Sequence, residues 1–328
     1  MAVTDIGMDI GSSWTRVYVR GKGVVLTEPS VAAYDKDRNK YVAYGDDAYA
    51  LIGRQSGNVT AVQPFRGGSI SDFAVLEEIL RYYIGKALGR RMLRKPYLCL
   101  CLPGSITEVE RRAVKEAAYQ AGARDVLLVP VTVAAAIGAG IDVTKPYGNL
   151  VADIGSGTTD IGILSMAGTV AESRIRTAGR SFDEAITRHI RRQHGLYISE
   201  SDAEDIKKRL GTAVKRPSQV RLEVSGRNVV TGDRAKITIT QEEIRQAIRE
   251  STEEIADAVH SMLEKTPPEL AADIVTRGIV LTGGGSLLGG LDAAIEERTG
   301  IHVMCAEEAQ LCVVRGTGRY AETIAAVG

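Results

Sequence analysis

The sequence predicts an α/β protein made of two related lobes. Strands alternate with helices along the chain, which is typical of a partly parallel sheet covered by helices. A strand–turn–strand unit occurs twice, in residues 6–19 and again in residues 150–164. The chain has 328 residues, and at about 100–200 residues per domain this length suits two domains or one fold with two lobes.

The two strand–turn–strand units share a short motif. Apolar residues recur at every second position on both sides of a glycine-containing turn, which is typical of a β-hairpin. Asp-Ile-Gly-Ser begins at Asp9 in the first unit and at Asp153 in the second. A single repeat of this size indicates a duplicated lobe, because a solenoid would need several short periods.

The remaining elements follow in order. Residues 30–64 read as an extended polar region, and Thr107 followed by Glu110 resembles a capping box at the start of a helix. Apolar spacing predicts helices over residues 72–88, 106–121, 133–139, 181–194, 201–210 and 241–263. Strands are expected over residues 97–102, 126–129, 220–224, 235–240 and 278–282.

Composition excludes several classes of protein. The 41 Lys and Arg balance the 41 Asp and Glu, whereas a general nucleic-acid binder usually has a basic excess. We find no apolar run long enough for a transmembrane helix and no signal-peptide pattern at the N-terminus. The cysteines form no C-x-x-C pair, so we expect reduced, buried thiols and no zinc site. They are Cys99, Cys101, Cys305 and Cys312.

Six of the 35 glycines lie in three short turns. Gly11-Ser12-Ser13 and residues 155–159 (Gly-Ser-Gly-Thr-Thr) each follow an aspartate within a predicted hairpin. Backbone N–H groups of such turns can cradle phosphate oxygens, and a preceding aspartate can hold Mg²⁺ through its water shell. Gly283-Gly284-Gly285 lies between a strand and a helix expected to run through Leu291. Each turn alone is more simply a tight turn, but the repetition favours phosphate binding.

The three turns, taken in order, resemble the phosphate-1, phosphate-2 and adenosine motifs of the actin, heat-shock-70 and sugar-kinase superfamily. Residues 105–123 (SITEVERRAVKEAAYQAGA) and 263–292 narrow the resemblance to the MreB family of bacterial actins, and the chain is identified as a divergent member. The resemblance implies the actin-like ATPase fold, with ribonuclease H-like duplicated lobes around a nucleotide cleft. One lobe would be residues 1–145 with 311–328 (small subdomain near 33–65), the other residues 146–310 (small subdomain near 180–243).

The resemblance also implies a set of site residues, with ATP and Mg²⁺ as ligands. Asp9 and Asp153 would lie near the metal and act in catalysis. The first phosphate turn would comprise Gly11, Ser12, Ser13 and Thr15, and the second Gly155, Ser156, Gly157, Thr158 and Thr159. Gly283, Gly284, Gly285 and Ser286 would lie beside the adenosine, with Glu204 and Lys207 flanking the base and ribose. Read without the resemblance, Glu204 and Lys207 are an ordinary exposed helical pair.

One segment departs from the family pattern. The family usually has Glu-Glu-Pro before its Met-Ala-Ala-Ala-Ile-Gly run, and a glutamate there positions the attacking water. This chain has Pro130-Val131-Thr132, in which only Thr132 could hydrogen-bond a water, as a poor base. We therefore expect ATP to bind and turn over slowly, and whether the chain is an enzyme stays open. Trp14, the only tryptophan, either packs at the hairpin tip or borders the cleft.

The family's known roles give the expected function. They imply head-to-tail filaments of this chain, with itself or MreB paralogues as partners, which direct cell shape and wall synthesis. Residues 90–95 place Met92 and Leu93 among four cations, which suits an anionic membrane surface; the alternative is a solvated turn. The expected location is cytoplasmic, peripheral on the inner face of the cell membrane.

Three alternatives remain. The chain could be a hydrolysis-deficient regulatory partner of another MreB, which the missing glutamate favours. It could be a sugar kinase of the same superfamily, which needs a catalytic aspartate facing a sugar pocket. A heat-shock-70 chaperone would need a substrate-binding domain after the nucleotide-binding part, and the sequence ends at Gly328.

Overall fold

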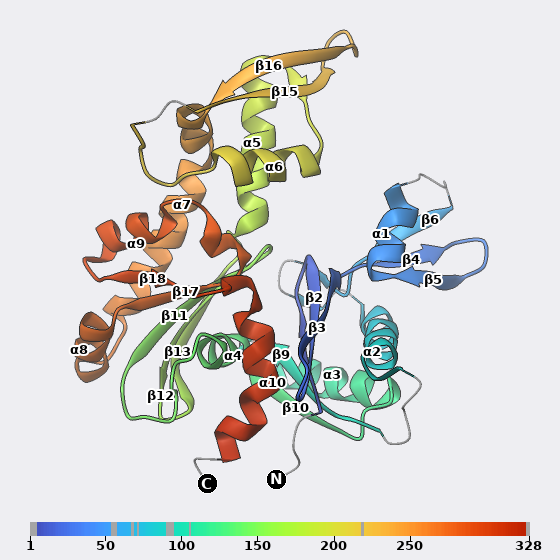
Figure 1. Cartoon of the computed structure of the whole chain (residues 1–328), viewed down its shortest axis with the longest axis vertical. Coiled ribbons are helices and arrows are strands. Elements are labelled where there is room, and N and C mark those ends of the chain that lie inside the picture. The colour runs from blue at the N-terminus through green and yellow to red at the C-terminus, as the bar shows by residue number, and fades with distance from the viewer. Residues whose placement is uncertain are drawn as a thin grey trace.

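The computed structural model describes residues 5–53, 58–66, 69–70, 72–89, 95–104, 106–217 and 220–325. Two five-stranded sheets form its centre (Figure 1). The strands of the first sheet are β1 (Ile6–Ile10), β2 (Trp14–Val19), β3 (Gly23–Pro29), β9 (Tyr97–Leu102) and β10 (Asp125–Pro130), in the order β10-β9-β1-β2-β3. Those of the second are β11 (Asn149–Ile154), β12 (Thr159–Ser165), β13 (Gly168–Ile175), β17 (Ile279–Thr282) and β18 (Val303–Cys305), in the order β13-β12-β11-β17-β18.

The predicted duplication is present in the backbone of the two hairpins. In the first hairpin (β1–β2), the Gly11 N–H donates to the Trp14 carbonyl at 3.0 Å. In the second hairpin (β11–β12), the Gly155 N–H donates to the Thr158 carbonyl at 2.9 Å. Each sheet then adds parallel strands beside the hairpin, β9 next to β1 and β17 next to β11. The mixed sheets and the alternation of strands and helices confirm the α/β prediction.

Two helices lie between the sheets, α4 (Val131–Gly138) and α10 (Cys312–Ala325) (Figure 1). Their contact is a backbone-to-backbone approach at two glycines. A Cβ built on Gly316 would lie 1.7 Å from the Ala134 carbonyl oxygen, and one on Gly138 would lie 1.7 Å from the Cys312 carbonyl oxygen. Apolar side chains from both sheets, such as Val129 and Val151, join the same buried cluster. The α4–α10 pair therefore connects the two halves of the molecule.

We expect Gly316→Ala to destabilise the protein by about 1–3 kcal/mol, because the added methyl forces the two helices apart. Gly85→Ala is the matched control, since a Cβ at Gly85 meets nothing within 4 Å. Helix propensity alone should make that control neutral or more stable by up to about 1 kcal/mol. Urea unfolding followed by circular dichroism compares the two, and equal stabilities of the two variants would contradict the packing argument.

The outer faces of the sheets are covered by further helices. On the first sheet these are α2 (Phe73–Leu88) and α3 (Glu108–Gln120), and on the second α7 (Gln241–Glu264), α8 (Pro268–Arg277) and α9 (Leu291–Thr299). Helix α5 (Gly179–His194) instead extends away from the second sheet and packs on α7. Asp72 accepts hydrogen bonds from Ala74 and Val75 at the start of α2, and the capping box of Thr107 and Glu110 begins α3 as predicted. Among the described residues, no helix combines the length and apolarity needed to cross a membrane.

Two smaller units extend from the two five-stranded sheets, one from each. One contains α1 (Gly45–Gly53) and the sheet β5-β4-β6, made of β4 (Ala32–Asp35), β5 (Lys40–Tyr44) and β6 (Val59–Val62). The other contains α6 (Glu200–Leu210) and the sheet β14-β15-β16, made of β14 (Leu196–Tyr197), β15 (Arg221–Asn228) and β16 (Arg234–Thr240). The two-stranded sheet β7 (Phe65–Arg66) and β8 (Ser69–Ile70) completes the set.

Two expectations about local structure were wrong. Residues 30–64 are not simply extended, because they include helix α1, whose Ala48 and Leu51 pack on the small sheet. The third glycine turn does not open a continuous helix through Leu291. A 3₁₀ helix spans Gly284–Leu287, and α9 begins only at Leu291, because Gly290 adopts a left-handed conformation (φ 72°) between them. The expectation of buried thiols is confirmed for Cys99 and Cys312 but is wrong for Cys305, which is exposed.

Candidate functional site

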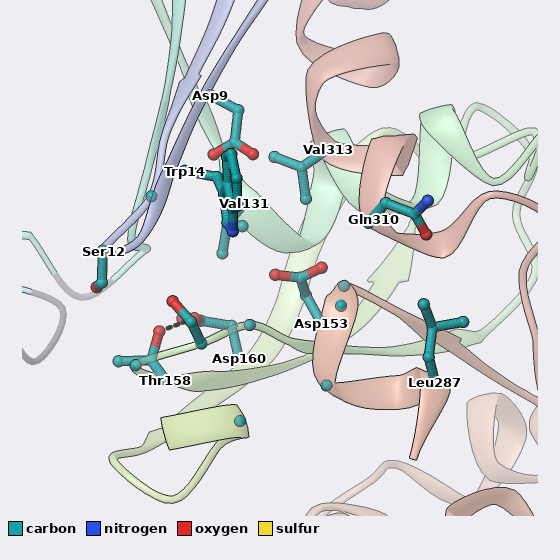
Figure 2. Close-up of a pocket in the computed structure, with 18 of the residues that line it drawn as sticks. Asp9, Ser12, Trp14, Val131, Asp153, Thr158, Asp160, Leu287, Gln310 and Val313 are labelled. Atoms are coloured by element: carbon teal, nitrogen blue, oxygen red, sulfur yellow. Dashed lines mark hydrogen bonds between the residues drawn. The ribbon is translucent and has the colours of Figure 1, made fainter. Parts of the chain in front are cut away.

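A cleft of about 490 Å³ lies where the turns of the two hairpins meet (Figure 2). Both sheets contribute to its lining, as do α6 and the third glycine turn. The cleft brings together most of the residues expected from the sequence. These are Asp9, Gly11, Ser12, Asp153, Gly155, Ser156, Gly157, Thr158, Glu204, Lys207, Gly283, Gly284 and Gly285.

The first two glycine turns face each other closely. A Cβ built on Gly157 would lie 2.8 Å from the Ser12 Oγ, so a larger side chain there would press on the opposite turn. Helix α5 holds the second turn from behind. Its Gly179 and Arg180 N–H groups donate to the Gly155 and Ser156 carbonyls at 3.0 and 2.8 Å. The carbonyl groups of this turn are therefore directed toward α5.

The third turn packs against the end of the second hairpin. Gly283 has φ 80°, and a Cβ there would lie 2.3 Å from the Ile154 carbonyl oxygen. A Cβ on Gly285 would lie 2.6 Å from the Ile154 Cγ2. Only glycine allows this approach, because any side chain would collide with backbone or core atoms. The glycines thus account for a close fit between two turns and leave the cleft open on their other side.

Several predicted residues support the turns from outside the cleft lining. Thr15 and Ser286 are buried; the hydroxyl of Thr15 pairs with that of Ser30 at 2.8 Å, and Ser286 Oγ donates to the Gly283 carbonyl at 2.7 Å. Thr159 Oγ1 donates to the Thr177 carbonyl at 2.7 Å. Ser13 accepts a backbone hydrogen bond from Ser30 at 2.9 Å. These side chains and backbone groups fix the shape of the turns.

Carboxylates gather at the floor of the cleft, where Figure 2 shows Asp9 and Asp153 directed into the space between the hairpins. Burial raises the pKa of Asp153 to about 7; the negative charges of Asp160 and Asp9 add to this, and the Thr282 hydroxyl, which donates at 2.8 Å, opposes it. Burial also raises the pKa of Asp9, against the effect of the nearby Arg16 guanidinium. The floor therefore carries negative charge that the fold leaves poorly compensated.

Three charged residues of this floor were not singled out in the sequence. Asp160 stands opposite Asp153 in the second hairpin, just as Arg16 stands opposite Asp9 in the first. Arg174 Nε donates to the Asp160 Oδ1 at 2.6 Å from the neighbouring strand. Burial raises the pKa of Asp160, and this ion pair counteracts it. Strand alternation within each hairpin could have identified them, because cross-strand partners of the two aspartates must lie on the same face of the sheet.

The donor set suits a hydrated Mg²⁺ more than a directly bound ion. Among residues described by the structure, no group of three or more His, Cys, Asp and Glu side chains is placed to enclose a metal. Mg²⁺ usually keeps several waters and takes only one or two carboxylates. Asp9 and Asp153 fit this mode, because burial raises the pKa of both carboxyls and a nearby cation favours the charged form of such a group.

Glu204 and Lys207 both line the cleft but do not pair with each other. Lys207 Nζ donates to the Gly179 carbonyl at 3.0 Å and to the Asp183 Oδ2 at 2.8 Å. Glu204 instead forms an ion pair with Lys208 at 2.8 Å, and its side chain is half exposed. Lys207 therefore ties α6 to the start of α5, whereas Glu204 is paired within its own helix.

The segment Pro130-Val131-Thr132 presents an apolar group to the cleft. Val131 is the first residue of α4 and lines both the cleft and an adjoining hollow of about 460 Å³. Thr132 lines only the hollow, is 2% exposed and packs on Gly162. Its Oγ1 is buried and makes no hydrogen bond to the rest of the described protein. Trp14 is 42% exposed and borders the cleft, which is the second of its two predicted positions.

Duplicated hairpins on two sheets, joined by α4 and α10 around a cleft, define the actin-like class of folds. The structure called "MamK double helical filament" has this fold, with a TM-score of 0.81 at 22% identity, over 97% of this chain and 98% of that one. The crystal structure of MreB5 of Spiroplasma citri bound to ADP is more similar. Its TM-score is 0.91 at 35% identity, over 97% of this chain and 96% of that one.

The sequence comparisons identify the family. The model of the MreB/Mbl protein family matches residues 3–328, and the chain belongs to this family. Cell shape-determining protein Mbl of Bacillus cereus is 43% identical over 324 residues, which cover 99% of this chain and 97% of that protein. Cell shape-determining protein MreB of Escherichia coli (strain K12) is 43% identical over 329 residues, which cover 99% and 95%.

Proposed function

We propose that this chain is a cytoskeletal protein that binds ATP with Mg²⁺ in the cleft and polymerises into filaments that direct cell shape. The observation that carries the proposal is the facing pair of glycine turns above Asp9 and the buried Asp153. Backbone N–H groups on both sides of a narrow cleft suit a chain of phosphates. Support also comes from structures of MreB5 of Spiroplasma citri bound to ADP and to AMPPNP, and from relatives named for cell shape.

Within this proposal, Asp9 and Asp153 would hold the water shell of Mg²⁺, which neutralises phosphate charge when bound. The third turn would lie beside the adenosine, with Glu204 and Lys207 near the base and ribose. The two lobes would be residues 1–145 with 311–328 and residues 146–310. The small subdomains near residues 33–65 and 180–243 would close the cleft from either side.

Light scattering of the purified protein tests the proposal, with electron microscopy of the same samples. We expect scattering to rise and filaments to appear with ATP and Mg²⁺, and neither to occur without nucleotide. A sugar kinase would instead consume ATP only when a sugar is added. Absence of both ATP binding and assembly would contradict the proposal, and sugar-dependent ATP consumption would replace it.

Val131 favours a second candidate, a hydrolysis-deficient regulatory partner of another MreB. Its apolar side chain stands at the edge of the cleft, where it can neither accept a proton nor orient water. The two candidates differ in whether the chain assembles alone. Filaments that form only when a paralogue is added would support the regulatory role.

We further propose that the protein works in the cytoplasm, peripherally on the inner face of the cell membrane. The basis is the sequence Arg-Arg-Met-Leu-Arg-Lys at residues 90–95. Met92 and Leu93 lie outside the described residues, so this element rests on the sequence pattern and on charge attraction to anionic lipid.

Co-sedimentation with anionic liposomes tests the membrane element. We expect the double variant Met92→Ser/Leu93→Ser to lose most of its liposome binding. Val229→Ser/Val230→Ser is the matched control, because it removes two exposed apolar side chains elsewhere on the surface, 48% and 88% exposed. If the Met92 and Leu93 variant sediments like the wild type, these residues have no part in membrane binding.

A further inference from the structure

Arg16 is a cation at the floor of the cleft. It lies on β2, opposite Asp9, and lines the cleft beside Gly11 and Ser12 of the first turn. Its side chain is only 15% exposed, and its guanidinium N–H group lies 3.6 Å from the Asp9 Oδ2. This distance is long for a charge-assisted hydrogen bond, which usually spans about 2.7–2.9 Å. The pairing with Asp9 is therefore loose.

The Arg16 Nε is buried and has no hydrogen-bond acceptor among the described residues. A guanidinium carries five N–H donors in a rigid plane and no acceptor, so each buried N–H needs an oxygen from elsewhere. A buried donor without a partner is unfavourable, which indicates that an acceptor is missing from this part of the cleft. Planar, paired N–H groups match the oxygens of a phosphate.

The second hairpin shows how unusual this cation is. Its equivalent position carries Asp160, which is bound to Arg174 at 2.6 Å. The positive charge of Arg16 also lowers the pKa of Asp153, so the guanidinium acts on both aspartates of the floor. Arg174 is held by a short ion pair, whereas Arg16 keeps a loose one, which leaves Arg16 as the guanidinium that can change partners.

We propose that Arg16 is a phosphate-binding residue of this chain, which moves from Asp9 to an oxygen of the terminal phosphates when a nucleotide binds. This inference rests on the proposed nucleotide function of the cleft. The exchange gives the Nε donor an acceptor and leaves Asp9 to the water shell of the metal. Because the protein itself then neutralises part of the phosphate charge, ATP binding depends less on Mg²⁺ than it does without Arg16.

Nucleotide affinity with and without metal tests the inference. Dissociation constants for fluorescent ATP and ADP analogues are measured in Mg²⁺ and in EDTA. We expect Arg16→Leu to weaken ATP binding by about 10–100-fold, the range for a lost hydrogen bond to a charged group, with the larger loss in EDTA. Arg16→Lys should recover part of the affinity, since it keeps the charge without the planar donors.

Arg209→Leu is the matched control, because Arg209 is exposed on α6, pairs with Asp205 and does not line the cleft. It should bind ATP like the wild type. Equal ATP affinity of Arg16→Leu and the wild type would overturn the inference and leave the nucleotide function standing. Where Arg16→Leu reduces folding, Arg16→Gln keeps a polar group opposite Asp9, and its unchanged affinity in EDTA would overturn the inference equally. Failure of the wild type to bind ATP would instead overturn the proposed function itself.

Discussion

Val131→Glu is expected to raise the rate of phosphate release from ATP by about 100-fold or more. A positioned general base typically contributes about 10²–10⁴-fold. Val131 is the first residue of α4 and lines the cleft, so a carboxylate on this stem would stand at the edge of the space between the hairpin turns. We expect a gain at the lower end of this range, because no other described residue of the cleft is arranged to orient the new carboxylate.

Single-turnover phosphate release from polymerised protein measures this effect directly. Val131→Gln is the control, because it has the same length and hydrogen-bonding reach but cannot accept the proton. We expect it to gain much less than the glutamate variant. Equal rates for Val131→Glu and the wild type would place the water-holding function elsewhere, and equal gains for Glu and Gln would point to positioning without base catalysis.

The glycine turns could be predicted from the sequence because each carries local information. Asp-Ile-Gly-Ser repeats, and its offset from the flanking apolar residues fixes both the hairpin and the side of the aspartate. The resemblance then placed the third turn, whose glycines are required by the close approach to Ile154. The 3₁₀ helix after that turn was not predicted, because Gly290 interrupts the helical pattern only through its left-handed conformation.

The orientation of residues 130–132 could not be predicted in the same way. Which of Val131 and Thr132 faces the cleft depends on how α4 is rotated against the second sheet. Gly162 on β12 leaves room for the Thr132 side chain, which therefore turns away from the cleft into the adjoining hollow. The orientation of these side chains depends on how α4 packs against β12. The sequence of either element alone does not predict it.

Arg16 and Asp160 could be predicted in part. Their positions follow from strand alternation once each hairpin is recognised, so the sequence did contain them. Their significance does not follow, because two charges of opposite sign occupy equivalent positions in the duplicated hairpins. The motif that the two hairpins share identifies them as a repeat, whereas the functional asymmetry lies at the position where they carry opposite charges.

Asp153→Asn is expected to make the nucleotide-free protein more stable at pH 8, by about 2–4 kcal/mol at roughly 1.4 kcal/mol per pKa unit. Burial raises the pKa of Asp153 to about 7 from an ordinary value of 3.8. The folded protein therefore holds a proton that the unfolded chain has already lost between these two values. Stability must fall as the pH rises through this interval and level off above it. Asparagine removes the charge while its carbonyl can still accept the Thr282 hydrogen bond.

Urea unfolding at pH 5 and pH 8, without nucleotide or Mg²⁺, separates this effect from a general change in packing. The advantage of Asp153→Asn should be larger at pH 8 than at pH 5, where Asp153 of the folded wild type is still protonated. Asp205→Asn, an exposed carboxylate on α6, should change stability by less than about 1 kcal/mol at either pH. Added Mg²⁺ and ATP should stabilise the wild type more than Asp153→Asn, because the charge that destabilises the empty cleft is one of the two that hold the cation. A variant less stable than the wild type at pH 8 would show that the buried carboxylate is already compensated within the fold.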